Sequence, residues 1–584
     1  MDLDLITSAL LSEFVLQHEL SDLPEDQQFE HFTAYSIISS HHSEDFSTDG
    51  VVVGGGNDLS IDACAIILNG RLVTDEAEVD DILKINGYLE VEFIFIQAKR
   101  SSNFDGSRMM TLCQNIKNGI FGDDDSLPKN DDIKSIIKMI RKIYSHAAKL
   151  RGNPECRIYY ATTGNWQDDA YLSSIISRQI QELIATNMFK GVQFHPLGAT
   201  QLQKFYRDTK YSIDREISFE RVVVLPAISK IKASYLGVLP ASEFLKLIID
   251  EEDNLIPSIF IDNVRDFQGD NPVNQDIATT IDSGFLDQFV IRNNGVTIVA
   301  RDLAITGQRF SVRDYQIVNG CQTSHVLFAH RKRIAAATDV LFVPVKLIHT
   351  DDEEIIQDVI KSTNRQTPID ENDLLALTKF QRDLETYYSG FSGGKRLYYE
   401  RRSRQYANTA AEKTRIVPVG MQLKVFASMF LDAPHQAGRY QATLLQAVGD
   451  RVFKSTHRQE PYYTAALAFY RLGGLLIRGH GGNADLRSFK FHFLMAFRYR
   501  FENSDRPSFE QKEVGPYCAA LNTVLWDDDT SRAAFEVCAD LVRQAASIRG
   551  LSIVRDTAKV RELADAIKEL ATSQNPRMLN KSSA

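Results

Sequence analysis

Apolar residues recur along the chain with two different spacings. In residues 1–50 they recur every three or four positions, which predicts two helices, the second near residues 29–39. Residues 65–68 form a short apolar run, and residues 91–99 place apolar side chains on both faces of a strand, so a buried hairpin is expected. Helical and strand-like patterns then alternate up to about residue 210, which predicts an α/β core.

The remaining sequence divides into a strand-rich part and a helical part. Strand-like runs dominate after residue 216, and helical spacing returns from about residue 380. Because 584 residues exceed what one hydrophobic core supports, several domains are expected. We predict an α/β domain at residues 1–215, a central α+β domain at 216–410 and a mostly helical domain at 411–584.

Composition narrows the class of protein. The six cysteines are scattered without a CxxC pair, which is typical of reduced thiols and excludes a disulfide framework or a cysteine zinc site. No apolar run approaches a membrane span and the first residues are acidic, so a cytoplasmic protein is expected. The formal charge of −11 argues against a nonspecific DNA coat, but a local basic surface could still bind nucleic acid.

Candidate chemistry begins with an acid and a lysine on the two predicted strands. Asp62 follows the glycine-rich segment 54–58, and Gln97 and Lys99 share one face at the end of the second strand. A carboxylate facing an ammonium group suits hydrolysis of a phosphodiester, with the carboxylate holding a divalent metal. The alternative is a buried hairpin whose lysine only extends its charge to solvent at the strand end.

This arrangement resembles the PD-(D/E)xK nucleases, specifically the Mrr-like branch. The resemblance implies a restriction-endonuclease-like N-terminal fold, Mg²⁺ or Mn²⁺ as cofactor, and Gln97 in place of the usual strand acid. It also implies that Glu30, on the helix near residues 29–39, supports the metal held by Asp62. Glu92 is the alternative candidate for this supporting carboxylate.

Four motifs in the central part resemble the AIPR family, named for abortive infection phage resistance. They occupy residues 263–269, 291–300, 317–327 and 362–370, and the resemblance covers roughly residues 230–410. It implies a role in the defence of a bacterium against phage.

The third motif predicts a turn that could hold an anion. Asn319 and Gly320 end an apolar strand, and a helix beginning near Gln322 and Thr323 would offer backbone and side-chain donors. The turn also resembles, less closely, the DGQQR-type turn of ParB-like domains, although Asn319 and Ser324 replace its acid and its arginine.

Asn364 and Arg365 of the fourth motif could form the other half of this nucleotide or polyanion pocket. Alternatively, these amides only cap strands and turns. Both interpretations stay open.

A basic and aromatic segment follows at residues 390–408. Arg401, Arg402 and Arg404 interleave with tyrosines, a pattern suited to a nucleic-acid backbone with exposed bases. A solvated charged face is the alternative.

Together these features predict a metal-dependent endonuclease of a phage-defence system, acting on DNA in preference to RNA. We expect a homo-oligomer controlled by its central domain, which would respond to a nucleotide or a phage-derived trigger. The competing hypothesis is a non-catalytic sensor or scaffold that binds nucleic acid or a nucleotide and carries a decayed nuclease domain.

Overall fold

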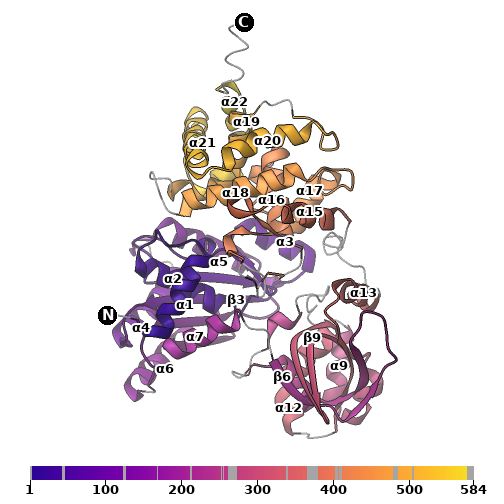
Figure 1. The fold of residues 1–584 in the computed structure, drawn as a ribbon. Coiled ribbons are helices and arrows are strands. Elements are labelled where there is room, and N and C mark those ends of the chain that lie inside the picture. Colours follow the sequence, from indigo (N-terminus) through magenta and orange to yellow (C-terminus); the bar gives the residue numbers. More distant parts are fainter. Residues whose placement is uncertain are drawn as a thin grey trace. The chain divides into compact units, whose positions relative to one another are not determined.

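The computed structural model forms two compact units (Figure 1). It describes residues 3–574 apart from 43–45, 123–125, 168, 211–213, 251–252, 254, 261–271, 337–339, 365–378, 402–404, 407–408, 410, 478–483 and 503–505. One unit comprises residues 1–35, 46–203 and 375–584, and the second comprises residues 36–45 and 204–374.

A five-stranded mixed sheet organises the N-terminal part of the first unit. Its strand order is β2-β1-β3-β4-β5, with β3 antiparallel to β1 and parallel to β4. The predicted pairing of the two apolar strands is confirmed, but a short strand and a helix separate them in sequence, so they do not form a simple hairpin. The strands are β1 (Ala63–Leu68), β2 (Arg71–Val73), β3 (Val91–Lys99), β4 (Glu155–Thr162) and β5 (Gly191–Leu197).

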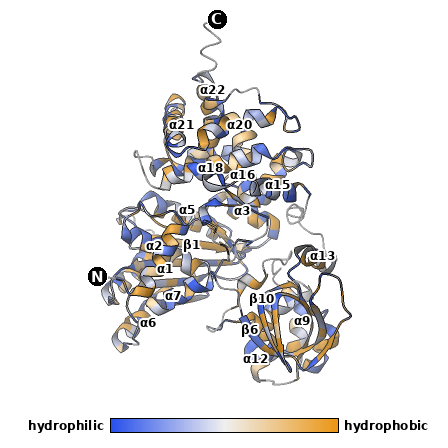
Figure 2. Cartoon of the chain, viewed as in Figure 1, coloured by the Kyte–Doolittle hydropathy of each residue, from blue (hydrophilic) through white to orange (hydrophobic). Residues whose placement is uncertain are grey.

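Helices surround this sheet and bury it. All six residues of β1 are buried, and this strand is hydrophobic along its length (orange in Figure 2). The apolar stripe of α5 packs into the same core, and Asn130 caps this helix by accepting a hydrogen bond from the N–H of Ile133 (2.9 Å). The helices are α1 (Leu5–Gln17), α2 (Glu25–Ile38), α3 (Glu76–Asn86), α4 (Gly106–Gln114), α5 (Asp131–Ser145), α6 (Ala170–Ile184) and α7 (Ala199–Asp208).

The second unit is built on a six-stranded sheet of order β6-β10-β9-β11-β8-β7. Its strands are β6 (Asp214–Ser218), β7 (Arg221–Val224), β8 (Ala233–Pro240), β9 (Val296–Thr306), β10 (Arg309–Asn319) and β11 (Phe342–His349). The accompanying helices are α8 (Ala241–Ile248), α9 (Pro272–Asp282), α10 (Phe289–Arg292), α11 (Cys321–Ala329), α12 (Arg331–Ala336) and α13 (Glu353–Asn364). Strands and helices thus mix in the central domain, as predicted.

The C-terminal part is mostly helical, which confirms the prediction. It contains a small parallel pair, β12 (Tyr398–Glu400) with β13 (Ile416–Pro418). Its helices are α15 (Lys379–Ser389), α16 (Val419–Phe430), α17 (Gln441–Val448), α18 (Glu460–Ile477), α19 (Lys490–Phe501), α20 (Val514–Leu525), α21 (Asp528–Ile548) and α22 (Arg561–Ser573). None of the helices within the described ranges is long and apolar enough to cross a membrane.

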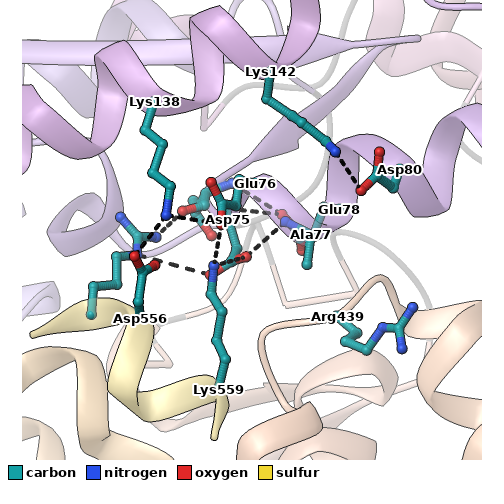
Figure 3. A network of polar contacts seen from close by, with 12 residues as sticks. Asp75, Glu76, Ala77, Glu78, Asp80, Lys138, Lys142, Arg439, Asp556 and Lys559 are labelled. Carbon is teal, nitrogen blue, oxygen red and sulfur yellow. Dashed lines mark hydrogen bonds and ion pairs between the residues drawn. The ribbon is translucent and has the colours of Figure 1, made fainter. Parts of the chain in front are cut away.

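Within the first unit, α3 docks on the helical part through a polar network (Figure 3). A capping box formed by Asp75 and Glu78 begins α3, and Gly87 in a left-handed conformation ends it. Ion pairs connect α3 and α5 to the C-terminal part, among them Asp75–Lys559 (3.0 Å), Asp81–Arg439 (2.8 Å) and Lys138–Asp556 (2.7 Å).

Asp81 is more deeply buried than Asp75 in this network, and its removal should destabilise the unit. The carboxylate is 3% exposed and accepts hydrogen bonds from the Arg439 guanidinium and from the N–H of Tyr440 (3.1 Å). Asp81→Ala should lower the free energy of unfolding by about 1–3 kcal/mol, because a peptide N–H loses its acceptor. The half-exposed Asp80→Ala on the same helix is the control for urea unfolding, and equal losses in both variants would contradict the prediction.

A buried histidine of α19 should make the protein sensitive to acid. Burial lowers the pKa of His492 from 6.5 to about 3, so the folded state stays unprotonated where the unfolded chain takes up a proton. The free energy of unfolding therefore loses nothing to this histidine above pH 6.5. It falls as the pH drops below that value, by about 2 kcal/mol at pH 5. Unfolding of wild type and His492→Leu at pH 7 and pH 5 should show a shallower pH dependence in the variant, and identical dependence would refute the assignment.

Candidate functional site

Asp62 and Lys99 meet at one end of the five-stranded sheet. The Lys99 ammonium lies 3.1 Å from Oδ2 of Asp62, and the same oxygen accepts a hydrogen bond from the N–H of Ala98 (2.7 Å). Asp62 is almost fully buried, whereas the side chain of Lys99 is 26% exposed. Burial raises the pKa of Asp62, and the Lys99 charge opposes that rise. The ammonium therefore remains accessible beside a desolvated carboxylate.

The glycine-rich turn is fixed to the cap of α5. The Asn130 side chain donates hydrogen bonds to the carbonyls of Gly54 (2.9 Å) and Gly56 (3.2 Å), and the N–H of Gly54 donates to Asp132 (3.2 Å). Gly55 has φ +79, a conformation that favours glycine. The turn thus places Asp62 beside β3, where the N–H of Asp62 donates a hydrogen bond to the carbonyl of Ile96 (2.9 Å).

Gln97 lies opposite Tyr160 of β4 in the strand register. Gln97 is 3% exposed, and its buried Oε1 has no hydrogen-bond donor among the described residues. Burial raises the pKa of Tyr160, to which Asp62 also contributes, so its hydroxyl keeps its proton. The sequence analysis did not single out Tyr160, because its position beside Gln97 depends on the register between β3 and β4.

Glu30 of α2 belongs to the same electrostatic environment. The pKa of Glu30 is raised to about 7, because partial burial and the Asp62 carboxylate raise it more than the Lys99 charge lowers it. Asp58 of the turn raises the pKa values of both acids. Three acids and one ammonium therefore leave an excess of negative charge at this end of the sheet.

These residues fit a divalent cation that keeps several waters. No group of three or more His, Cys, Asp or Glu side chains in a metal-binding arrangement occurs within the described residues. Mg²⁺ usually binds through only one or two carboxylates plus substrate phosphate oxygens, and Asp62 and Glu30 supply such a pair. The unsatisfied amide oxygen of Gln97 adds a polar group that water or a metal would satisfy.

Glu92 does not belong to this site. It is the second residue of β3, seven residues from Lys99, which corresponds to about 23 Å along a strand. Its carboxylate forms an ion pair with Arg157 instead. Of the two carboxylates considered beside Asp62, the structure therefore brings only Glu30 into range.

The central residues predicted to bind an anion line one cavity of about 570 Å³ in the second unit. Gly320 has φ +101 and precedes α11, and a Cβ there would lie 2.7 Å from Val296, so only glycine fits. The predicted residues at this cavity are Asn319, Gly320, Gln322 and Thr323.

A neighbouring wall of the cavity carries residues to which the sequence analysis gave no ligand role. Asp276 comes from α9, and Arg292, Asn293 and Asn294 surround the end of α10. The Asn293 side chain donates a hydrogen bond to Oγ1 of Thr323 (3.0 Å), which joins the two walls. The Arg-Asn-Asn-Gly run, a typical turn sequence, is the signal that could have revealed them.

The other candidate binding residues divide into two groups. Arg365, Arg402 and Arg404 lie outside the described residues, as does the side chain of Asn364. Arg401 is buried and donates a hydrogen bond to Glu385 (2.8 Å).

Other cations of the basic segment also serve the fold. The Lys395 ammonium lies 3.8 Å from the centre of the Trp526 ring, and Arg396 donates hydrogen bonds to the carbonyls of Tyr388 and Phe391. Among the described residues of the basic segment at 390–408, Arg401 is thus buried and ion-paired, Arg396 is half-buried and bonded to backbone carbonyls, and Lys395 is exposed. The expectation for Arg401 is corrected accordingly, because its charge is already paired inside the protein.

A family model described as AIPR protein matches residues 260–575, more than half of the chain. The chain belongs to the AIPR family. Membership implies a phage-defence protein of the abortive-infection type. The match extends beyond the region near 230–410 that carried the resemblance and includes the helical part. No curated protein and no solved structure matches the chain.

Two motifs of this AIPR chain meet at the central cavity. Residues 291–300 contain Arg292 and the turn before β9, and residues 317–327 contain the turn before α11. Asn319 is paired with Thr297 in the sheet register, which places the two turns side by side. The family match begins at residue 260, so it does not include the Asp62 site.

Proposed function

We propose that this AIPR protein is a metal-dependent endonuclease that cleaves DNA, in preference to RNA, during phage defence. The observation that carries the proposal is the contact between the buried Asp62 carboxylate and the partly exposed Lys99 ammonium, beside Glu30. The mixed sheet supports it, because the acid and the lysine lie on adjacent strands at one sheet end. A restriction-endonuclease-like N-terminal domain is part of this proposal.

Each residue has a distinct role in the proposed hydrolysis. Asp62 and Glu30 would hold Mg²⁺ or Mn²⁺, which supplies charge neutralisation and an acidified water when bound. The Lys99 ammonium, with 26% of its side chain exposed, would contact the phosphate and stabilise the charge that develops on it. Gln97 would orient water through its unsatisfied amide oxygen.

The test is cleavage by the purified full-length protein. Labelled DNA and RNA are incubated with Mg²⁺, with Mn²⁺ and with a chelator, and cleavage of DNA that disappears with the chelator is expected. Absence of cleavage of either nucleic acid under all conditions would reject the nuclease.

One observation favours the second candidate, a non-catalytic sensor or scaffold. Asp62 already accepts the N–H of Ala98 and the Lys99 ammonium, as a carboxylate would if it only capped the sheet end. Under this alternative, Lys99→Ala would lower the stability of the protein. Phage protection would then fall only as far as the amount of folded protein falls. Phage plating with strains that express matched protein levels separates the two candidates.

A further inference from the structure

We propose that the central cavity binds a nucleoside monophosphate unit, either free or at the 5′ end of a strand. The cavity volume of about 570 Å³ falls in the range of small-molecule sites. The proposal concerns the second unit alone and does not depend on the nuclease assignment.

Arg292 offers an uncompensated positive charge at the cavity. Its guanidinium donates a hydrogen bond to the amide of Gln288 (2.7 Å) and stacks on Phe285, and no carboxylate of the described residues forms an ion pair with it. The five arginines that follow in sequence behave differently, because each contacts a carboxylate: Arg301, Arg309, Arg313, Arg331 and Arg333. A planar guanidinium without a carboxylate partner is suited to bind a phosphate.

The charges that line the cavity limit the ligand to few negative groups. Among the described lining residues only Asp276 and Arg292 carry charge, and they do not form an ion pair with each other. A triphosphate would bring several negative charges to a single cation. One phosphate is matched by Arg292 and by the positive end of α11, which has no side-chain cap.

The remaining lining groups suit a nucleoside. Asp276 is exposed, and a carboxylate in this position can accept hydrogen bonds from ribose hydroxyls. Asn294 and Asn319 carry amides that both donate and accept, as the edge of a nucleobase requires, whereas Oε1 of Gln322 already accepts a hydrogen bond from Asn274 (2.7 Å). The side chains on the two walls are already joined through Asn293 and Thr323, so less ordering is needed on binding.

The experiment is calorimetric titration of the full-length protein with the four ribonucleoside 5′-monophosphates in the presence of a chelator. Micromolar binding of at least one is expected, with weaker binding of its triphosphate. Removing the phosphate from the ligand or changing Arg292→Gln should each weaken binding roughly 10- to 100-fold. The two losses should not add, because removing the phosphate already removes its contact with Arg292.

The matched control is Arg309→Gln, an exposed arginine of the same unit that pairs with Glu216. It should bind as wild type does. A 5′-phosphorylated tetranucleotide distinguishes the sources, since binding tighter than that of the monophosphate indicates a strand end and weaker binding a free nucleotide. No binding of any monophosphate up to about 1 mM, additive losses, or a preference for triphosphate would overturn the proposal. Cleavage is not measured, so failure of the nuclease assignment would leave this result unaffected.

Discussion

Lys99→Ala should abolish metal-dependent cleavage and phage protection while leaving the protein folded. The ammonium is the positive group beside the proposed metal site, and loss of such a group typically lowers the rate by at least about a hundredfold. Its side chain is partly exposed, so its removal should change the thermal midpoint little. Asp62→Asn should be equally inactive, because its amide oxygen can still accept the N–H of Ala98 but binds a metal poorly.

Lys84→Ala provides the control for this substitution. Lys84 is an exposed lysine of α3 in the same unit, and its removal should leave cleavage and protection unchanged. Cleavage rates, phage plating and thermal unfolding are measured for all variants. An active Lys99→Ala, or inactivity that accompanies unfolding, would show that the pair is structural.

Glu30→Gln should weaken metal use and stabilise the metal-free protein. The carboxylate has a pKa of about 7 when folded and an ordinary value of 4.5, so the folded state keeps a proton that the unfolded chain loses between these pH values. Stability therefore falls as the pH rises from 4.5 to 7, and the full penalty is present above pH 7. After allowance for partial exposure, Glu30→Gln should raise the free energy of unfolding at pH 8 by about 1–3 kcal/mol.

The same substitution should raise the Mg²⁺ concentration for half-maximal cleavage by about tenfold, because one of two carboxylate ligands is lost. Unfolding in chelator at pH 8 and pH 4.5, and cleavage across a magnesium series, measure both effects. The stability gain should vanish at pH 4.5, where Glu30 is protonated in wild type. Glu13→Gln, which changes an exposed acid of α1, should show neither effect, and a silent Glu30→Gln would remove Glu30 from the site.

Local patterns were enough to predict the elements around Asp62. The apolar run at residues 65–68 and the pattern of residues 91–99 predicted two strands, which the structure pairs. Gln97 and Lys99 are two residues apart on the second strand, which predicted that their side chains point to the same face. The choice between Glu30 and Glu92 could not be made from sequence. It depends on which end of β3 meets α2, which is a long-range packing relation.

Other features depended on partners distant in sequence. The composition of residues 390–408 suggests a nucleic-acid surface, yet Arg401 is neutralised by Glu385, and the Lys395 ammonium lies over the face of Trp526. The motif at residues 291–300 was interpreted only as a family marker, so the ligand role of Arg292 was missed. The cavity that Arg292 lines also requires residues of α9, which lie outside that motif. The spacing of residues within a segment predicts which side chains share a face. It does not predict which charged side chains of other segments pack against that face.

The docking of α3 has a consequence for biosynthesis. Glu76 lies 483 residues before Lys559, the partner of its carboxylate (3.3 Å). At elongation rates of 5–20 residues per second, a ribosome needs about 25–100 s to make the intervening chain. During this interval the acids of α3 can pair with Lys138 and Lys142 of α5 but not with Lys559 or Arg439 of the C-terminal part. Fragments truncated after residue 215 lack Arg439, the partner of the buried Asp81 carboxylate, so the N-terminal sheet is expected to be less stable without the C-terminal helices.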